Sequence, residues 1–299
     1  MRVRTTLILT LVLIPACSTG TGSDRGATRT VAVVAAENSW GSLAAQLGGD
    51  HARVRSIISN PDTDPHDYEA TPADGRAVAS ARYLVHNGLG YDSWAAKLAA
   101  ANPSSSRRVL DVGALVGKKE GDNPHRWYFP GDVEKVITSI TSDYTRLDPA
   151  DAAYFDRQHA QFEAEGLKRY KDLLAQIKRR YAGTPVGASE SIFEGIAEAT
   201  GLELRTPKSF LDAISEGTDP TAQDKATVDR QLAQKQVKVL VYNSQNATPD
   251  VKSLVDQAQA HGIPVTTVTE TPPVGTQFQD WQAEQLQSLA DALARATGR

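Results

Sequence analysis

The sequence predicts an α/β protein of two lobes, each a mainly parallel sheet flanked by helices, joined by one long rigid helix. Three observations support this prediction. Short apolar runs alternate with helical stretches in both halves of the chain, as in successive β-α-β units. A long helical stretch without proline separates the two halves. The chain has 299 residues, 40% of them hydrophobic, which is enough for two cores.

The first residues have the pattern of a secretory signal. Two arginines precede an apolar run at residues 7–14, which is shorter than the roughly 20 residues that span a bilayer. The only cysteine, Cys17, follows Ala16 at the end of this run, so no intrachain disulfide can form. A small residue before cysteine resembles a bacterial lipobox. We therefore expect a lipoprotein signal peptide at 1–17, lipidation of Cys17 and a flexible Gly/Ser/Thr-rich tether at 18–29. The alternative is an ordinary signal with an incidental cysteine.

The N-terminal α/β lobe is expected to span residues 30–147. Its clearest boundary is the sequence Thr71-Pro72-Ala73-Asp74, where threonine suits the N-cap and proline the first helical position. Strands are predicted at 30–36, 54–58, 83–86 and 109–110, and helices at 39–48, 72–81, 92–101 and 132–147.

An interdomain helix is predicted at 148–181. Asp148-Pro149 begins it, and no further proline occurs before residue 181. At 1.5 Å per residue such a helix is about 50 Å long, too long for a crossover helix within one small lobe. Gly166 is its weak point, so the alternative is an ordinary helix kinked near this residue.

The C-terminal α/β lobe is expected to span residues 182–299 and to repeat the alternation of the first lobe. Strands are predicted at 186–188, 202–206, 237–242 and 265–268, and helices at 191–199, 220–234, 249–261 and 277–296.

Four side chains are candidate metal ligands. His66 and His125 each follow a proline and precede an aromatic residue, in Asp64-Pro65-His66-Asp67-Tyr68 and Asn123-Pro124-His125-Arg126-Trp127. Proline stiffens such loops, and histidine is the commonest metal ligand. Glu190 and Glu270 follow predicted strands of the second lobe, where open parallel sheets bind ligands. We therefore predict that two imidazoles and two carboxylates hold one divalent cation between the lobes.

Each candidate ligand also has an ordinary interpretation. The two histidines could be solvated loop residues, and Glu190 could simply complement a helix dipole. Glu270 could be a solvated loop acid. The remaining histidines, at positions 51, 86, 159 and 261, lack the Pro-His setting or have the pattern of surface residues, and we leave them out of the site.

Taken together, these motifs identify a resemblance. The chain resembles the solute-binding lipoproteins of bacterial ABC importers for manganese and zinc over nearly all of its mature length. The features that carry the resemblance are Asp64 to Pro72, Asn87-Gly88 through Trp94, Pro124 to Trp127, Asp148-Pro149, and Ser189 to Phe193. The resemblance implies that Glu190 is the third ligand and that Glu270 replaces a fourth acid that is often aspartate.

The function implied by this resemblance is capture of Mn²⁺ or Zn²⁺ as cargo and delivery to an ABC permease in the membrane. The protein is expected to be extracytoplasmic, anchored through Cys17, monomeric and without catalytic residues. Two carboxylates slightly favour manganese, although zinc accepts the same atoms in tetrahedral geometry. A formal charge of −4 provides no basic footprint for nucleic acid.

Three other readings compete with the importer. A secreted metallohydrolase would need an open coordination position and a general base, and neither His-Glu-x-x-His nor Gly-x-Ser-x-Gly occurs. A lipoprotein adhesin with a structural metal would not exchange its ion. A binding protein for a chelated metal, such as a siderophore or corrinoid, would share the long helix but would not require four converging ligands.

Overall fold

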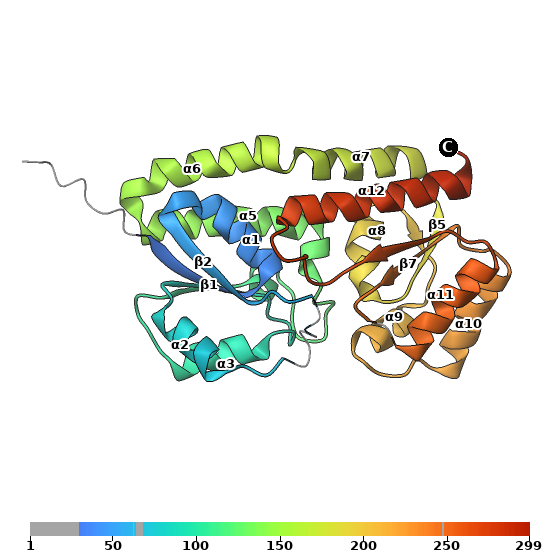
Figure 1. Ribbon diagram of the computed structural model, residues 1–299, viewed down its shortest axis with the longest axis horizontal. Coiled ribbons are helices and arrows are strands. Elements are labelled where there is room, and N and C mark those ends of the chain that lie inside the picture. Colours follow the sequence, from blue (N-terminus) through green and yellow to red (C-terminus); the bar gives the residue numbers. More distant parts are fainter. Residues whose placement is uncertain (1–29, 62, 64–67, 247) are drawn as a thin grey trace, which may run out of the picture.

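The computed structural model describes residues 30–61, 63, 68–246 and 248–299 of the chain. Cys17 and His66 lie outside the described residues, so the predicted lipidation site and one predicted ligand receive no structural account. Within the described ranges the chain forms two four-stranded sheets with helices on both faces, as Figure 1 shows. No helix in these ranges has the length and apolar character needed to cross a membrane.

The first sheet is entirely parallel, with strand order β2-β1-β3-β4. Its strands are β1 (Val31–Glu37), β2 (Ala52–Ile58), β3 (Tyr83–His86) and β4 (Arg108–Asp111). The helices of this part are α1 (Asn38–Gly48), α2 (Pro72–Ser80), α3 (Ser93–Ala101), α4 (Val112–Leu115) and α5 (Pro130–Leu147), with 3₁₀ turns η1 (Gly49–His51) and η2 (Arg126–Tyr128).

Successive residues of β1 face opposite sides of this sheet, because side chains alternate along a strand. Val33 and Ala35 belong to the core that includes α1 and α5, whereas Val34 packs with Val78 of α2 and Leu98 of α3. A strand buried on both faces reads as a continuous apolar run, which is how β1 could be predicted from sequence.

The second sheet repeats this arrangement, with strand order β6-β5-β7-β8 and parallel pairing throughout. Its strands are β5 (Pro185–Ala188), β6 (Glu203–Leu204), β7 (Val239–Asn243) and β8 (Val265–Val268). Its helices are α8 (Glu194–Thr200), α9 (Lys208–Ser215), α10 (Ala222–Ala233), α11 (Pro249–Ala260) and α12 (Phe278–Thr297), with the 3₁₀ turn η5 (Ser191–Phe193).

Three elements differ clearly from the sequence prediction, and one of them is the four-residue helix α4, which was not predicted. Strand β6 has two residues rather than the five predicted at 202–206. Helix α9 was not predicted, although Phe210, Leu211 and Ile214 have the spacing of a helix face and are buried. This helix has only eight residues and begins directly after Pro207, so its helical pattern of hydrophobic residues was too short to be recognised.

The connecting helix is irregular at its middle, where Leu167 lies in a turn between two helical elements. It consists of a 3₁₀ turn η3 (Pro149–Asp151), α6 (Ala152–Gln161), a π-helical turn η4 (Phe162–Gly166) and α7 (Lys168–Tyr181). A Cβ at Gly166 would lie 2.6 Å from the ring of Phe162, so glycine lets this buried ring pack against the backbone. The irregularity therefore falls at the weak point that the sequence indicates.

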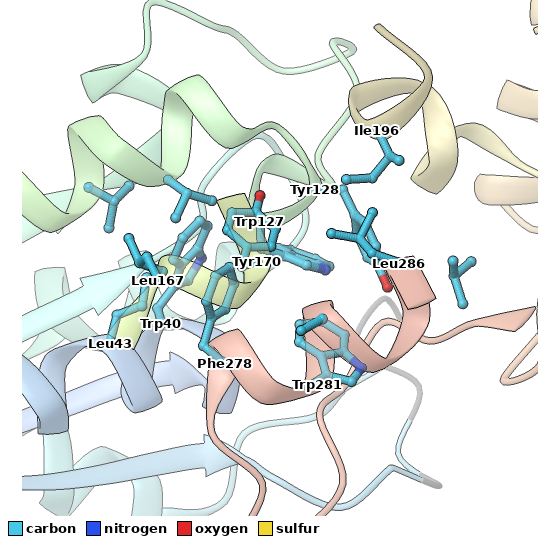
Figure 2. Close-up of a cluster of buried hydrophobic side chains, with 14 of the residues drawn as sticks. Trp40, Leu43, Trp127, Tyr128, Leu167, Tyr170, Ile196, Phe278, Trp281 and Leu286 are labelled. Carbon is cyan, nitrogen blue, oxygen red and sulfur yellow. The ribbon is translucent and has the colours of Figure 1, made fainter. Parts of the chain in front are cut away.

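One apolar core runs from the first sheet to the second. Helix α12 runs beside α7, as Figure 1 shows. Its first turn lies against α1, where the Phe278 backbone N–H donates to Ser42, and the chain ends beside Tyr181 at the end of α7. Figure 2 shows the aromatic centre of this core, which draws residues from α1, η2, α7 and α12. Its large rings are Trp40, Trp127, Tyr128, Tyr170, Phe278 and Trp281. Because the rings interlock, the two halves are joined by packing as well as by the connecting helix.

Asp74 anchors the start of α2, immediately after the stretch that contains the first Pro-His motif. Its carboxylate accepts hydrogen bonds from the Thr71 backbone N–H at 2.9 Å and from the Tyr68 hydroxyl at 2.8 Å, and it pairs with Arg55 at 3.0 Å. Burial alone would raise the pKa of Asp74, but the hydrogen bonds from Thr71 and Tyr68 and the charge of Arg55 outweigh burial and lower it.

We expect Asp74→Asn to lower the free energy of unfolding by about 1–2 kcal/mol at neutral pH, because it removes a capping carboxylate with several donors. A lowered folded-state pKa stabilises the fold above the unfolded pKa, and this contribution is lost as pH falls through the folded value. The difference between variant and wild type in urea denaturation should therefore shrink in acid. Asp224→Asn is the control, because the Asp224 carboxylate, in the first turn of α10, accepts a hydrogen bond from the hydroxyl of the N-cap residue Thr221. An equal loss in both variants would contradict the role given to Asp74.

Candidate metal site

Polar side chains gather where the strands of both sheets end. Glu37 and His86 are the last residues of β1 and β3, and Asn243 is the last residue of β7. Glu190 and Glu270 each follow the end of a strand, β5 and β8 respectively. Since the strands of each sheet are parallel, their carboxyl ends share one edge, as expected from the sequence.

Hydrogen bonds between the two halves show that these edges face each other. Asn38 Nδ2 donates to the Pro272 carbonyl at 2.9 Å, and Gln245 Nε2 donates to the Pro61 carbonyl at 2.6 Å. Tyr91, between β3 and α3, donates its hydroxyl to Glu270 Oε2 at 3.0 Å. The predicted ligands of the second lobe therefore lie against the loops of the first.

His125 is fully buried, and its tautomer follows from its neighbour Asn123. The Asn123 amide donates through Nδ2 to the Ser191 carbonyl at 2.7 Å and to Glu194 Oε2 at 2.9 Å. Its oxygen therefore faces His125, where it lies 2.9 Å from the backbone N and 3.0 Å from Nδ1. Nδ1 must carry the proton in this arrangement, which gives Nε2 the lone pair that a metal ligand needs.

Glu190 is 1% exposed and lies at the start of η5. Asn246 Nδ2 donates to its Oε2 at 2.9 Å. The hydroxyl oxygen of the next residue, Ser191, lies 3.3 Å from His125 Nδ1. The segments that carry Glu190 and His125 are therefore adjacent. The donor from Asn246 is neutral and orients the carboxylate without cancelling its charge, as is typical around ligating carboxylates.

Glu270 is held at both carboxylate oxygens. Asn243 Nδ2 donates to Oε1 at 2.8 Å, and Tyr91 donates to Oε2. The backbone N–H of Glu270 donates to Gln245 Oε1 at 2.6 Å, which fixes the main chain. Burial, and secondly the charge of Glu270, raise the pKa of Tyr91 well above its ordinary value, so this hydroxyl remains a donor at neutral pH.

A buried cluster of titratable side chains supports the loop that carries Tyr91. Asp92 accepts from the backbone N–H groups of Asn87 at 2.6 Å and Gly88 at 2.8 Å. Burial, and secondly the charge of Asp92, raise the pKa of Glu37 well above its ordinary value. His86 lies 3.6 Å from Asp92; burial opposes its protonation, but Asp92 and Asp111 outweigh burial and raise its pKa.

Sequence reasoning missed the residues that orient the predicted ligands. They are Asn123, Asn243, Asn246, Tyr91 and Asp92. Asn123 lies in the second Pro-His motif, and Tyr91 and Asp92 follow Asn87-Gly88. Both motifs could have indicated these orienting residues from the sequence. The pairing of Asn243 with Glu270 joins segments 27 residues apart, and no sequence motif indicates it.

The described ligand atoms of His125, Glu190 and Glu270 do not all come within 4.8 Å of one another. In the part of the chain that the structure describes, the one trio of metal-ligating residues this close is His51, Asp148 and Asp151, which is half-buried and lies away from the strand ends. His51 Nδ1 lies 2.7 Å from Asp151 Oδ2, and its ring stacks on Tyr154 at 4.0 Å. These contacts tie η1 to the start of the connecting helix, a structural role that the prediction of a surface His51 did not include.

Comparisons with known proteins agree with this fold. The model of the family described as zinc-uptake complex component A, periplasmic, matches residues 33–292. The manganese ABC transporter substrate-binding lipoprotein PsaA of Streptococcus mitis is 22% identical over 97% of each chain. The iron-binding protein YfeA of Yersinia pestis is 29% identical over 54% of each chain.

Among solved structures, the periplasmic metal-binding protein of Candidatus Liberibacter asiaticus superposes with a TM-score of 0.72 at 18% identity, covering 88% of this chain and 99% of that one. This likeness shows that the two-lobed fold is shared. The family model extends from β1 to α12, and this protein therefore belongs to the family of periplasmic component A of zinc-uptake complexes.

Proposed function

We propose that this protein captures a divalent transition-metal cation, Mn²⁺ or Zn²⁺, outside the cytoplasm and delivers it to the membrane permease of an ABC importer. Family membership supports a receptor for metal cargo, and the relatives named above include a manganese-transporter lipoprotein and an iron-binding protein. This is a binding function, so no residue is assigned a catalytic role.

The observation that carries the proposal is the setting of His125. Its imidazole is buried, its Nδ1–H is directed to Asn123, and its segment adjoins that of Glu190 from the opposite lobe. Glu270 approaches the same loops through Tyr91. We propose that His125, Glu190 and Glu270, together with His66, hold the cation. Two imidazoles and two carboxylates fit a first-row divalent ion.

The mechanism we propose uses small movements. We assign the lobes to residues 30–147 and 182–299 and the connecting helix to 148–181. The shared aromatic core and the helix limit how far the lobes separate, so capture and release require limited closure or rearrangement of loops. We further propose that the lipoprotein signal is cleaved before Cys17 and that the lipidated Cys17 then anchors a monomer through the tether.

The test is a metal titration of the chain from Ser18, stripped of metal, with Mn²⁺ and Zn²⁺. We expect one ion to bind per chain with a rise in melting temperature. At a free ion concentration of 100 times Kd the fold gains about 2.7 kcal/mol. Absence of binding by both ions, with binding of a ferric siderophore or a corrinoid instead, would replace this proposal by the chelate-binding alternative.

A further inference from the structure

The side-chain amide of Gln245 joins the two lobes at the strand ends. Its Nε2 donates to the Pro61 carbonyl of the first lobe at 2.6 Å. Its Oε1 accepts from the backbone N–H of Glu270 at 2.6 Å and from that of Thr271 at 3.0 Å, both in the second lobe. One amide therefore connects the loop after β2 with the segment that carries a proposed ligand.

The orientation of this amide follows from its partners. The two backbone N–H groups can only donate, so they require the amide oxygen, and the Pro61 carbonyl can only accept, so it requires the amide nitrogen. The main chain of Gln245 is held as well, since its N–H donates to Asn243 Oδ1 at 3.0 Å. Asn243 in turn donates to Glu270 Oε1 at 2.8 Å. Gln245 is therefore built into the second lobe and reaches the first lobe through Nε2.

An ion at the proposed site would be enclosed by the surrounding chain. His125 is fully buried and Glu190 is 1% exposed, and the two residues come from opposite lobes. Because neither side chain is open to solvent, an ion held by both can enter or leave only when the loops at the strand ends move apart. The hydrogen bond from Gln245 to Pro61 spans the lobes at these ends and opposes that movement.

We propose that Gln245 is a positioning residue whose hydrogen bond to Pro61 holds the lobes closed over the site and slows exchange of the ion, an inference that rests on the proposed function. The amide of Gln245 contacts the main chain of Glu270, not its carboxylate. It therefore acts alike on the empty and the loaded site. Gln245 accordingly raises the barrier to both entry and release and has little effect on the affinity.

The test is Gln245→Glu, which keeps an oxygen for the two N–H donors and removes the donor to Pro61. Entry of Zn²⁺ or Mn²⁺ into metal-free protein, and release into excess chelator, are followed by stopped-flow tryptophan fluorescence, since Trp127 lies 5.6 Å from the His125 ring. We expect both rate constants to rise about 2- to 10-fold, the range for one hydrogen bond, while Kd changes by less than about 2-fold. A salt concentration of about 0.5 M screens the added charge.

Two further variants keep the inference falsifiable. Gln245→Met removes the donor without adding a charge, and both of its rate constants should rise as in Gln245→Glu. Gln231→Met is the matched control, because Gln231 Nε2 also donates to a backbone carbonyl, that of Arg205, at 2.8 Å, but within one lobe. Its rate constants should equal those of the wild type. Circular dichroism and thermal unfolding show that each variant folds.

The outcomes separate the two proposals. Unchanged rate constants in both Gln245 variants overturn the role of Gln245 and leave the receptor function standing. A faster release without faster entry also overturns it, because Gln245 would then stabilise the loaded state rather than hold the lobes closed. An equal rise in Gln231→Met overturns it too, since the effect would not depend on contact between lobes. Failure of the wild type to bind Mn²⁺ or Zn²⁺ overturns the receptor function itself, and this inference with it.

Discussion

Replacing His125 by alanine is expected to lower the affinity for both Mn²⁺ and Zn²⁺ at least about tenfold, or roughly 1.4 kcal/mol. The same result is expected for His66→Ala. His125 is the predicted ligand with the best defined geometry, since Asn123 fixes its tautomer and Ser191 lies beside the same nitrogen. Loss of its imidazole removes one of the two proposed nitrogen ligands and leaves a site with three protein ligands.

The measurement is calorimetric titration of the metal-free variant, with circular dichroism and thermal unfolding to show that it still folds. His159→Ala provides the control, because His159 lies half-buried on α6, far along the chain from every strand end. It should bind both ions as the wild type does. Wild-type affinity in His125→Ala would show that His125 is not a ligand.

Phe278→Ala is expected to lower the free energy of unfolding by about 3–5 kcal/mol, the usual cost of emptying a large buried aromatic site. Phe278 is fully buried at the start of α12, where its ring lies 6.2 Å from Tyr170 of α7 and 6.1 Å from Trp281. Its backbone N–H donates to Ser42 of α1 at 2.9 Å. The residue therefore contacts elements of both lobes at once.

Because one core joins the lobes, Phe278→Ala should unfold in a single cooperative transition at a lower denaturant concentration, followed by circular dichroism and tryptophan fluorescence. Val274→Ala is the control for loss of apolar surface, since Val274 is 77% exposed, and should change stability by less than about 0.5 kcal/mol. Two separate transitions in the wild type would show that the lobes unfold independently and that the core does not couple them.

A coupled core also bears on how the receptor works. Lobes that share Trp40, Trp127 and Phe278 cannot rotate far without separating packed rings. Recognition of the loaded state by a permease would then depend on local rearrangement at the strand ends. Two hydrogen bonds join the halves near these strand ends, from Asn38 to the Pro272 carbonyl and from Gln245 to the Pro61 carbonyl. A rearrangement at the strand ends would change them.

The sequence predicted most of the elements because local physics dictates them. Strand β1 is a continuous apolar run, α2 begins at a threonine with proline and aspartate after it, and the long helix lacks proline until its end. The predicted helices begin and end within a few residues of the observed ones. Helix α9 and the short β6 were misjudged because neither has enough residues to establish a period.

The four candidate ligands could also be proposed from sequence, since the two glutamates follow predicted strands and the two histidines belong to Pro-His motifs. Most of the contacts that orient these candidates could not. Asn123 sets the tautomer of His125, and Asn243 and Tyr91 hold Glu270 from two lobes. The two contacts to Glu270 join positions 27 and 179 residues apart, which no local pattern encodes, whereas Asn123 lies two residues from His125.

The sequence by itself determined the class of fold, and it predicted the division at the long helix and the chemical type of the proposed ligands, because hydrophobic period, caps and strand-end positions are local properties of the chain. Only the tertiary structure decided that both halves share one aromatic core and that Tyr91 reaches Glu270 across the interface. The physical reason is that packing and hydrogen bonding between distant segments follow from the arrangement of whole elements, not from any one of them.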